Sequence, residues 1–232
     1  MAYRFNIFDN GAALAETLAE RVAGTLAEAV AMRGHASIAV SGGSTPKAFF
    51  RALSSTTLDW SRVTITLVDE RFVPESNERS NHALVSAGLL QGKAAEARFV
   101  PLYHDGATAE DAARLATAAT VDLCRPFDVV VLGMGGDGHT ASFFPGGSNL
   151  QMALDPATPR GVITMEAEGA GEPRLTFTFS ALQDARLLIL HIESQSKKPV
   201  IDRALSEGKD STLPIGRVIA TASSDTEIYW AP

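Results

Sequence analysis

The chain of 232 residues lacks the features that mark several classes of protein. It has a single cysteine, Cys124, which excludes an internal disulfide, and no Cys/His cluster with zinc spacing surrounds it. We interpret Cys124 as a small, partly buried apolar side chain beside a strand. No apolar run approaches the roughly 18–20 residues of a membrane span, and the N-terminal segment has no signal-peptide pattern. We therefore expect a cytoplasmic protein with no membrane partner.

Positive charge is also scarce, with 20 Lys and Arg residues against 27 Asp and Glu residues and a net charge of −7. Such a chain offers no basic field to a nucleic-acid backbone, so we expect no nucleic-acid partner. A few local hydrogen-bond donors can still bind a small anion at one pocket. Because 45% of the residues are hydrophobic and only 20% are charged, the chain is expected to fold rather than to stay disordered.

Strands and helices are predicted to alternate along the chain. Apolar side chains recur every four residues from Leu14 to Val30, which predicts a helix over residues 11–32 with Asp9 or Asn10 as its cap. Further strands are predicted over residues 4–8, 37–40, 63–68, 99–102, 127–132, 162–165, 175–179, 187–192 and 227–230. Further helices are predicted over residues 47–53, 81–90, 108–124 and 195–208.

Several of these strands are apolar on both faces, which is typical of parallel sheets that helices cover on two sides. We predict an α/β fold: a mostly parallel open sheet with helices on both faces, Rossmann-like. The Gly- and Pro-containing stretch 146–161 is interpreted as a long loop rather than a linker. Residues 1–232 are therefore expected to form a single domain.

Polar clusters follow three of the predicted strands, at residues 41–45, 69–71 and 133–140. In open α/β sheets, ligands bind outside the carboxyl ends of the strands. Because the carboxyl ends of parallel strands meet at one edge of the sheet, we expect these clusters to form one site.

The third cluster contains Gly133, Gly135 and Gly138, which match the G-x-G-x-x-G spacing of dinucleotide-binding loops. The context argues against a nucleotide. Pro145 comes too soon for a long helix to start at the loop, and Asp155 does not end a second strand where a ribose-binding acid belongs.

The same loop carries His139, a candidate general base, because an imidazole with a pKa of about 6.5 can activate water near neutral pH. Asp137 could hydrogen-bond this imidazole and fix its tautomer, or bind substrate hydroxyls directly. Both interpretations of Asp137 remain open from the sequence.

The first cluster, Ser41-Gly42-Gly43-Ser44-Thr45, can offer backbone N–H groups and hydroxyls to an anion at a helix N-terminus. Thr45 suits the N-cap position and Pro46 the first helical position. The alternative is a capped tight turn with no ligand. The segment lacks the Gly-Lys-Ser/Thr ending of a P-loop, so ATP is not implied.

The second cluster, Asp69-Glu70-Arg71, supplies a planar guanidinium at a strand end. Arg71 could bind a phosphate, a carboxylate or a developing oxyanion. The alternative is a local ion pair of Arg71 with Asp69 or Glu70.

Taken in order, these clusters resemble the glucosamine-6-phosphate isomerase/6-phosphogluconolactonase family over nearly the whole chain. The segments that carry the resemblance are Ser41-Gly42-Gly43-Ser44-Thr45-Pro46, Asp69-Glu70-Arg71-Phe72-Val73-Pro74 with Ser80-Asn81, Gly133-Met134-Gly135-Gly136-Asp137-Gly138-His139-Thr140-Ala141-Ser142 and Pro173-Arg174-Leu175-Thr176. The resemblance implies a fold of the glucosamine-6-phosphate deaminase/ribose-5-phosphate isomerase type. It also implies hydrolysis of 6-phosphoglucono-1,5-lactone to 6-phosphogluconate, the second step of the oxidative pentose phosphate pathway.

The resemblance further implies roles for individual residues. His139 would take a proton from the water that attacks C1, and Arg71 would stabilise charge on the substrate oxygens. The loop from Ser41 to Thr45, Arg174 and Lys197 are similar to the family's phosphate clamp, and Asp69 is placed among the substrate-binding residues. The segment before Lys197 lacks the family's usual glycine, so Lys198 is an alternative to it. No metal or organic cofactor is implied.

Two other functions are weighed against lactone hydrolysis. The deaminase branch of the family continues from the histidine into an acidic residue before a proline, whereas this chain has Phe144 before Pro145. The missing carboxylate favours water addition over a proton relay between two carbons. A non-catalytic sugar-phosphate sensor would need no base, so Asp137 and His139 argue against it. Whether the protein is a monomer or a homodimer is left open.

Overall fold

The computed structural model describes residues 3–105, 108–123 and 126–232, so Cys124 lies outside the described residues. Its main sheet has seven strands in the order β1-β10-β9-β6-β2-β3-β5, and every neighbouring pair is parallel. The bounds of these strands are β1 (Tyr3–Ile7), β2 (Ala36–Val40), β3 (Val63–Leu67), β5 (Arg98–Val100), β6 (Val129–Leu132), β9 (Leu187–Glu193) and β10 (Thr226–Ala231). The predicted mostly parallel sheet is confirmed.

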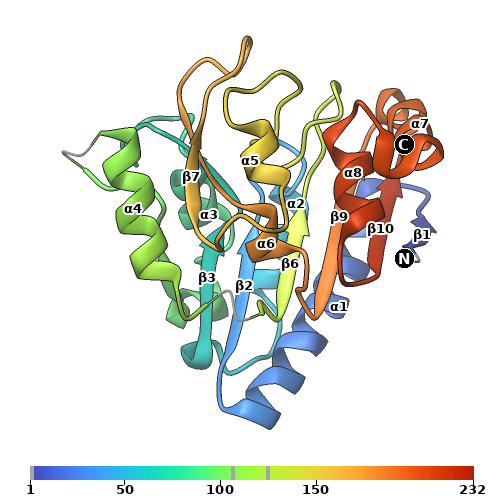
Figure 1. The fold of residues 1–232 in the computed structure, drawn as a ribbon. Coiled ribbons are helices and arrows are strands. Elements are labelled where there is room, and N and C mark those ends of the chain that lie inside the picture. The colour runs from blue at the N-terminus through green and yellow to red at the C-terminus, as the bar shows by residue number, and fades with distance from the viewer. Residues whose placement is uncertain (1–2, 106–107, 124–125) are drawn as a thin grey trace.

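Helices lie on both faces of this sheet, with α6 in front of it and α2 behind it in Figure 1. All residues of the central strands β2 and β6 are buried, as expected for strands that are covered on two sides. The helices are α1 (Gly11–Arg33), α2 (Lys47–Ser54), α3 (Asn81–Gly88), α4 (Ala109–Thr120), α5 (Leu150–Leu154), α6 (Phe179–Leu182), α7 (Lys198–Glu207) and α8 (Pro214–Thr221), and the 3₁₀ turns are η1 (Trp60–Arg62), η2 (Gly92–Glu96), η3 (Gln195–Lys197) and η4 (Gly208–Asp210).

Helix α1 begins as the sequence predicts, and Asn10 is the residue that caps it. The Ala13 N–H donates to Asn10 Oδ1 at 2.9 Å. The buried side chains of α1 include Leu14, Leu18 and Val22, which join the apolar cluster that also contains the central strands. None of the helices in the described parts of the chain has both the length and the apolar character needed to cross a lipid bilayer.

A second sheet of three strands departs from the predicted topology. It has the order β4-β8-β7, with β4 (Asp69–Arg71), β8 (Arg174–Phe177) and β7 (Val162–Met165), and both of its pairs are antiparallel. The chain passes from one sheet to the other at Val68. Its N–H donates to Val40 O in the main sheet, and its carbonyl accepts the Phe177 N–H of the second sheet. Residues 69–71, interpreted from the sequence as a polar cluster after a strand, therefore form a strand themselves.

Some predicted elements differ from the observed ones in their bounds, and some observed helices were not predicted. The predicted helix over 195–208 is divided into η3 and α7, and the predicted loop over 146–161 contains α5. Helix α4 begins after Thr108, whose Oγ1 accepts the Asp111 N–H, and it ends at Thr120. Helix α8 was missed, although Pro214 at its first turn and its apolar spacing are signals for a helix.

The predicted N-cap at Thr45 is wrong. Helix α2 begins at Lys47 with Pro46 at the N-cap, and no side chain makes a capping hydrogen bond there. The Pro46 carbonyl accepts the Phe50 N–H at 2.8 Å, which closes the first helical turn without a side-chain cap. The Thr45 side chain instead belongs to the wall of a pocket.

Candidate active site

The three polar clusters meet where the order of the sheet reverses. The chain runs outward from β2 to β3 and β5 on one side, and from β6 to β9 and β10 on the other. Two hydrogen bonds join the loop that follows β2 to β6 and to the loop that follows β6. Ser41 N–H donates to Val131 O at 3.0 Å, and Gly133 N–H donates to Ser41 Oγ at 2.9 Å. Such a reversal point is the usual ligand site of open α/β sheets.

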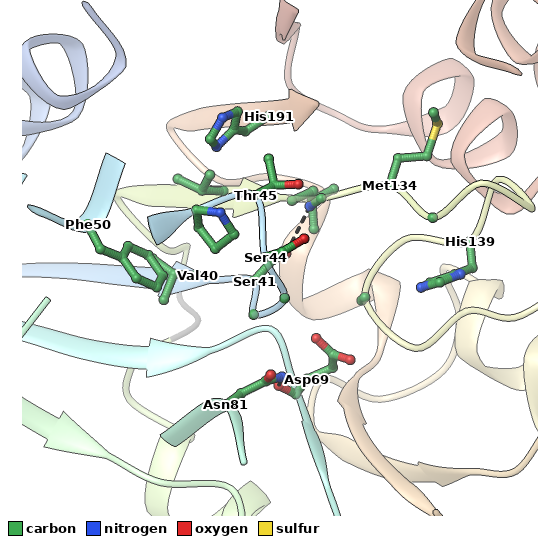
Figure 2. Close-up of a pocket in the computed structure, with 18 of the residues that line it drawn as sticks. Val40, Ser41, Ser44, Thr45, Phe50, Asp69, Asn81, Met134, His139 and His191 are labelled. Carbon is green, nitrogen blue, oxygen red and sulfur yellow. Dashed lines mark hydrogen bonds between the residues drawn. The ribbon is translucent and has the colours of Figure 1, made fainter. Parts of the chain in front are cut away.

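A pocket opens at this edge of the sheet, and Figure 2 shows Ser41, Ser44 and Thr45 grouped between Asp69 and His191. Nearly all of the predicted site residues line it: Ser41, Gly42, Gly43, Ser44, Thr45, Asp69, Arg71, His139, Arg174 and Lys197. Among the predicted site residues, all of which the structure describes, only Asp137 lies outside the wall of the pocket.

Asp137 lies against the imidazole of His139. Its Oδ1 is 2.6 Å from His139 Nδ1 and also accepts the His139 backbone N–H at 3.1 Å. Burial raises the pKa of the Asp137 carboxyl, but the hydrogen bonds and the charge of His139 together outweigh this effect and hold the pKa below its usual value. A carboxylate at Nδ1 favours a proton on that nitrogen, which leaves Nε2 as the basic atom.

Arg71 and Arg174 are brought together by the second sheet, where they are directly paired across β4 and β8. The Nε atoms of both side chains are buried without a hydrogen-bond partner. Burial lowers the pKa of the Arg174 guanidinium, and the Asp69 carboxylate opposes this shift from 4.0 Å away. Two guanidinium groups beside a pocket, each with a buried Nε that has no partner, are suited to binding an anion.

In the described residues, Glu70 does not form the local ion pair with Arg71 that was weighed as an alternative. The Glu70 carboxylate accepts the backbone N–H groups of Arg71, Asn81 and His82, each at 2.7 Å. Burial raises the pKa of Glu70, and these three N–H groups oppose the shift. Arg71 Nη1 donates to the Arg79 carbonyl. Glu70 thus holds the start of α3 and leaves the Arg71 guanidinium at the pocket.

The structure distinguishes between the two candidate lysines. Lys197 ends η3 and lines the pocket, where burial lowers the pKa of its ammonium group and the charge of Glu193 opposes the shift. The Lys198 Nζ is bound to Asp202 at 2.6 Å, one turn further along α7, and lies 5.1 Å from the centre of the Phe5 ring. Of the two lysines, Lys197 is therefore the one that lines the pocket.

Sequence reasoning did not select two other residues of the pocket wall, Asn81 and His191. Asn81 Nδ2 donates to Asp69 O at 2.9 Å, and its Oδ1 is buried without a partner. A Cβ atom on Gly42 would lie 1.9 Å from that Oδ1, so glycine is needed where the loop passes the amide. Ser80, the capping residue of α3 that directly precedes Asn81, is a sequence signal that could have indicated Asn81. His191 is 3% exposed, and its Nε2 is hydrogen-bonded to Glu193 Oε1 at 2.9 Å.

Within the described ranges, no group of three or more His, Cys, Asp and Glu side chains is arranged to hold a metal ion. The donors that gather at the pocket are instead backbone N–H groups, hydroxyls, guanidinium groups and an ammonium group, beside the imidazoles of His139 and His191. This set of groups suits a small phosphorylated ligand and a reaction with water.

Comparison with known proteins agrees with this geometry. Residues 9–230 match the family of glucosamine-6-phosphate isomerases and 6-phosphogluconolactonases. A 6-phosphogluconolactonase of Rhizobium meliloti is 63% identical over the full length of both chains. The crystal structure of a 6-phosphogluconolactonase from Shewanella baltica superposes with a TM-score of 0.94 at 40% identity and covers 99% of this chain and 98% of its own.

A more distant structure shares the fold alone. A monomeric glucosamine-6-phosphate deaminase superposes with a TM-score of 0.80 at 18% identity, over 98% of this chain and 97% of its own. The predicted deaminase-type fold is confirmed by this likeness. Together, the match over residues 9–230 and the 63% identity over the whole chain show that this protein belongs to the glucosamine-6-phosphate isomerase/6-phosphogluconolactonase family.

Proposed function

We propose that this protein is a 6-phosphogluconolactonase, which hydrolyses 6-phospho-D-glucono-1,5-lactone to 6-phosphogluconate in the oxidative pentose phosphate pathway. The observation that carries the proposal is the His139 imidazole, held through Nδ1 by Asp137 and facing a pocket whose other walls supply anion-binding groups. Relatives named for this activity, at up to 63% identity over the full chain, support it.

The reaction begins with proton transfer to His139. Nε2 takes a proton from a water molecule as its oxygen attacks C1 of the lactone, and the carbonyl electrons move onto the former carbonyl oxygen. Asp137 holds the ring and stabilises the imidazolium that forms. Arg71, with its buried unpaired Nε, stabilises the negative oxygen of the tetrahedral intermediate.

The intermediate then collapses to open the ring. The oxygen at C1 restores its double bond, the bond from C1 to the ring oxygen breaks, and the imidazolium returns its proton to that ring oxygen, which becomes the C5 hydroxyl. The new carboxylic acid loses its proton to solvent. His139 ends the cycle neutral, so the reaction consumes only the lactone and one water molecule.

The phosphate is assigned to the loop from Ser41 to Thr45, with Lys197 and Arg174. The loop follows β2 and offers backbone N–H groups and hydroxyls just ahead of α2. Lys197 approaches from the end of β9, and β9 and β2 lie on the two sides of β6. We also infer that residues 1–232 act as one domain, in the cytoplasm, on a small sugar-phosphate lactone and without a nucleic-acid or membrane partner.

Replacing Lys197 with alanine is expected to weaken the binding of 6-phosphogluconate by about 1.5–3 kcal/mol, roughly 10- to 150-fold, because a charge-assisted contact to the phosphate is lost. The matched control is Lys198→Ala, which removes a surface pair with Asp202 and a contact with the Phe5 ring, both outside the pocket wall, and should change the affinity by less than about threefold. Isothermal titration calorimetry of both variants measures the difference. The reverse ranking would assign the phosphate to Lys198.

The proposed function is tested by following freshly prepared 6-phosphogluconolactone with and without the protein, since the lactone also opens spontaneously. The expected result is a rate well above the spontaneous one, with no ammonia released from glucosamine 6-phosphate in a parallel reaction. Release of ammonia would assign the chain to the deaminase branch instead. Binding of 6-phosphogluconate without any acceleration of lactone hydrolysis would support the alternative of a non-catalytic sugar-phosphate sensor.

A further inference from the structure

Phe144 contacts two functional groups of the site at once. Its ring centre is 4.4 Å from that of His139, with 36° between the ring planes, and the Arg174 Cζ lies 5.3 Å from the centre of the same ring. Phe144 is 6% exposed and is not part of the pocket wall. Any effect of Phe144 on a substrate in the pocket must therefore pass through side chains of the site that it contacts.

These contacts add to constraints that the polar neighbours leave incomplete. Asp137 fixes His139 at Nδ1, but a single hydrogen bond in the ring plane leaves rotation about its axis free. Arg174 Nη2 donates to Ala170 O at 2.7 Å, while its Nε has no partner. An aromatic ring supplies the missing constraint in both cases: a surface against which the imidazole packs, and a negative face that attracts the guanidinium.

The charge of the site makes the aromatic character important. Burial disfavours the charged form of Arg174, and Arg71 lies next to it on the adjacent strand. A proton taken up by His139 adds a second cation beside the same ring. The π face of Phe144 attracts a cation without bringing a competing carboxylate into reach of the substrate.

We propose that Phe144 is a positioning residue that aligns His139 for proton transfer and holds Arg174 toward the phosphorylated substrate through its aromatic face. The inference rests on the proposed lactonase function. Under this proposal, Phe144 supports catalysis by positioning His139 and Arg174, and does not only fill the apolar core. The alternative is that Phe144 only fills volume, as its neighbour Phe143 does in the apolar core.

The experiment separates the aromatic face from the volume of the side chain. Phe144 is replaced through an expanded genetic code by phenylalanines carrying one, two, three and five fluorine atoms, which withdraw π density while nearly preserving shape. We expect kcat to fall stepwise with fluorination, by about 5- to 30-fold at five fluorines, and KM to rise as Arg174 is released. The thermal midpoint of unfolding should stay close to that of the unsubstituted protein.

The matched control is the same series at Phe143, which is fully buried and, among the described residues, makes neither ring contact. There kcat and KM should stay within about twofold. Phe144→Leu, if it folds, should show the same kinetic losses as the fluorinated protein. Unchanged kcat and KM in the fluorinated Phe144 series, or equal losses at Phe143, would overturn the positioning role alone. No hydrolysis by the unsubstituted protein would overturn the proposed function and this inference with it.

Discussion

Replacing His139 with alanine is expected to lower kcat for lactone hydrolysis by about 10²–10⁴-fold, the usual contribution of a general base. The variant loses the His139 imidazole, which lines the pocket and whose Nδ1 is held by Asp137. Among the described residues, no other imidazole of the pocket wall is paired with an aspartate in this way. The variant keeps the loop from Ser41 to Thr45, Arg174 and Lys197. The affinity for 6-phosphogluconate should therefore change by less than about threefold.

Two measurements check this prediction: initial rates on fresh lactone, corrected for spontaneous opening, and calorimetric binding of the product. His35→Ala is the matched control, because His35 is exposed and lies outside the pocket wall. Its Nδ1 is 3.2 Å from the Arg33 carbonyl oxygen. Turnover like that of the unsubstituted protein in the His139 variant would remove the general-base assignment. A large loss of product affinity would mean that His139 binds substrate instead of activating water.

Replacing Gly135 with alanine is expected to lower kcat by about 10²-fold while leaving His139 in the chain. A Cβ atom at this position would lie 2.2 Å from His139 Cε1, 2.3 Å from its Nδ1 and 2.7 Å from Asp137 Oδ1. The methyl group and the imidazole cannot occupy the same space, so the ring must leave Asp137. A displacement of about 1 Å is enough to cost two orders of magnitude in rate.

The adjacent glycine provides the control. A Cβ atom on Gly136 meets no atom within 4 Å, and Gly136 is not among the residues with a positive φ. Gly136→Ala should therefore retain kcat within about threefold. Equal activity of the two variants would show that the close approach at Gly135 does not hold the imidazole in its catalytic position.

The position of the site could be predicted because the signals for it are local. Strands β2, β3 and β6 are short apolar runs that each end in polar residues, and parallel strands present their carboxyl ends at one edge. The signal against a nucleotide-binding loop is equally local. Pro145 prevents a helix from following the glycine loop, and the next helix in the structure begins at Leu150.

The second sheet could not be predicted, because a strand of three charged residues carries no strand signal of its own. Asp69–Arg71 becomes β4 only by pairing with β8, about a hundred positions further along the chain. The adjacency of Arg71 and Arg174 follows from that pairing. Helix α8 likewise supports the glycine loop from a distance, where the Ile215 N–H donates to the Gly138 carbonyl at 3.1 Å.

The sequence by itself determined the fold class, the family and the loop that carries His139, since these depend on residue types at short spacing. The tertiary structure decided the direction of individual side chains. It turned Asp137 toward the imidazole and Lys197 toward the pocket. Ser194, with a positive φ of 106°, precedes the 3₁₀ turn that ends at Lys197, and Asp202 binds Lys198 from one helical turn away. Neighbouring lysines look equivalent in a sequence, and only the backbone path and the partners around them make one a ligand and the other a surface ion pair.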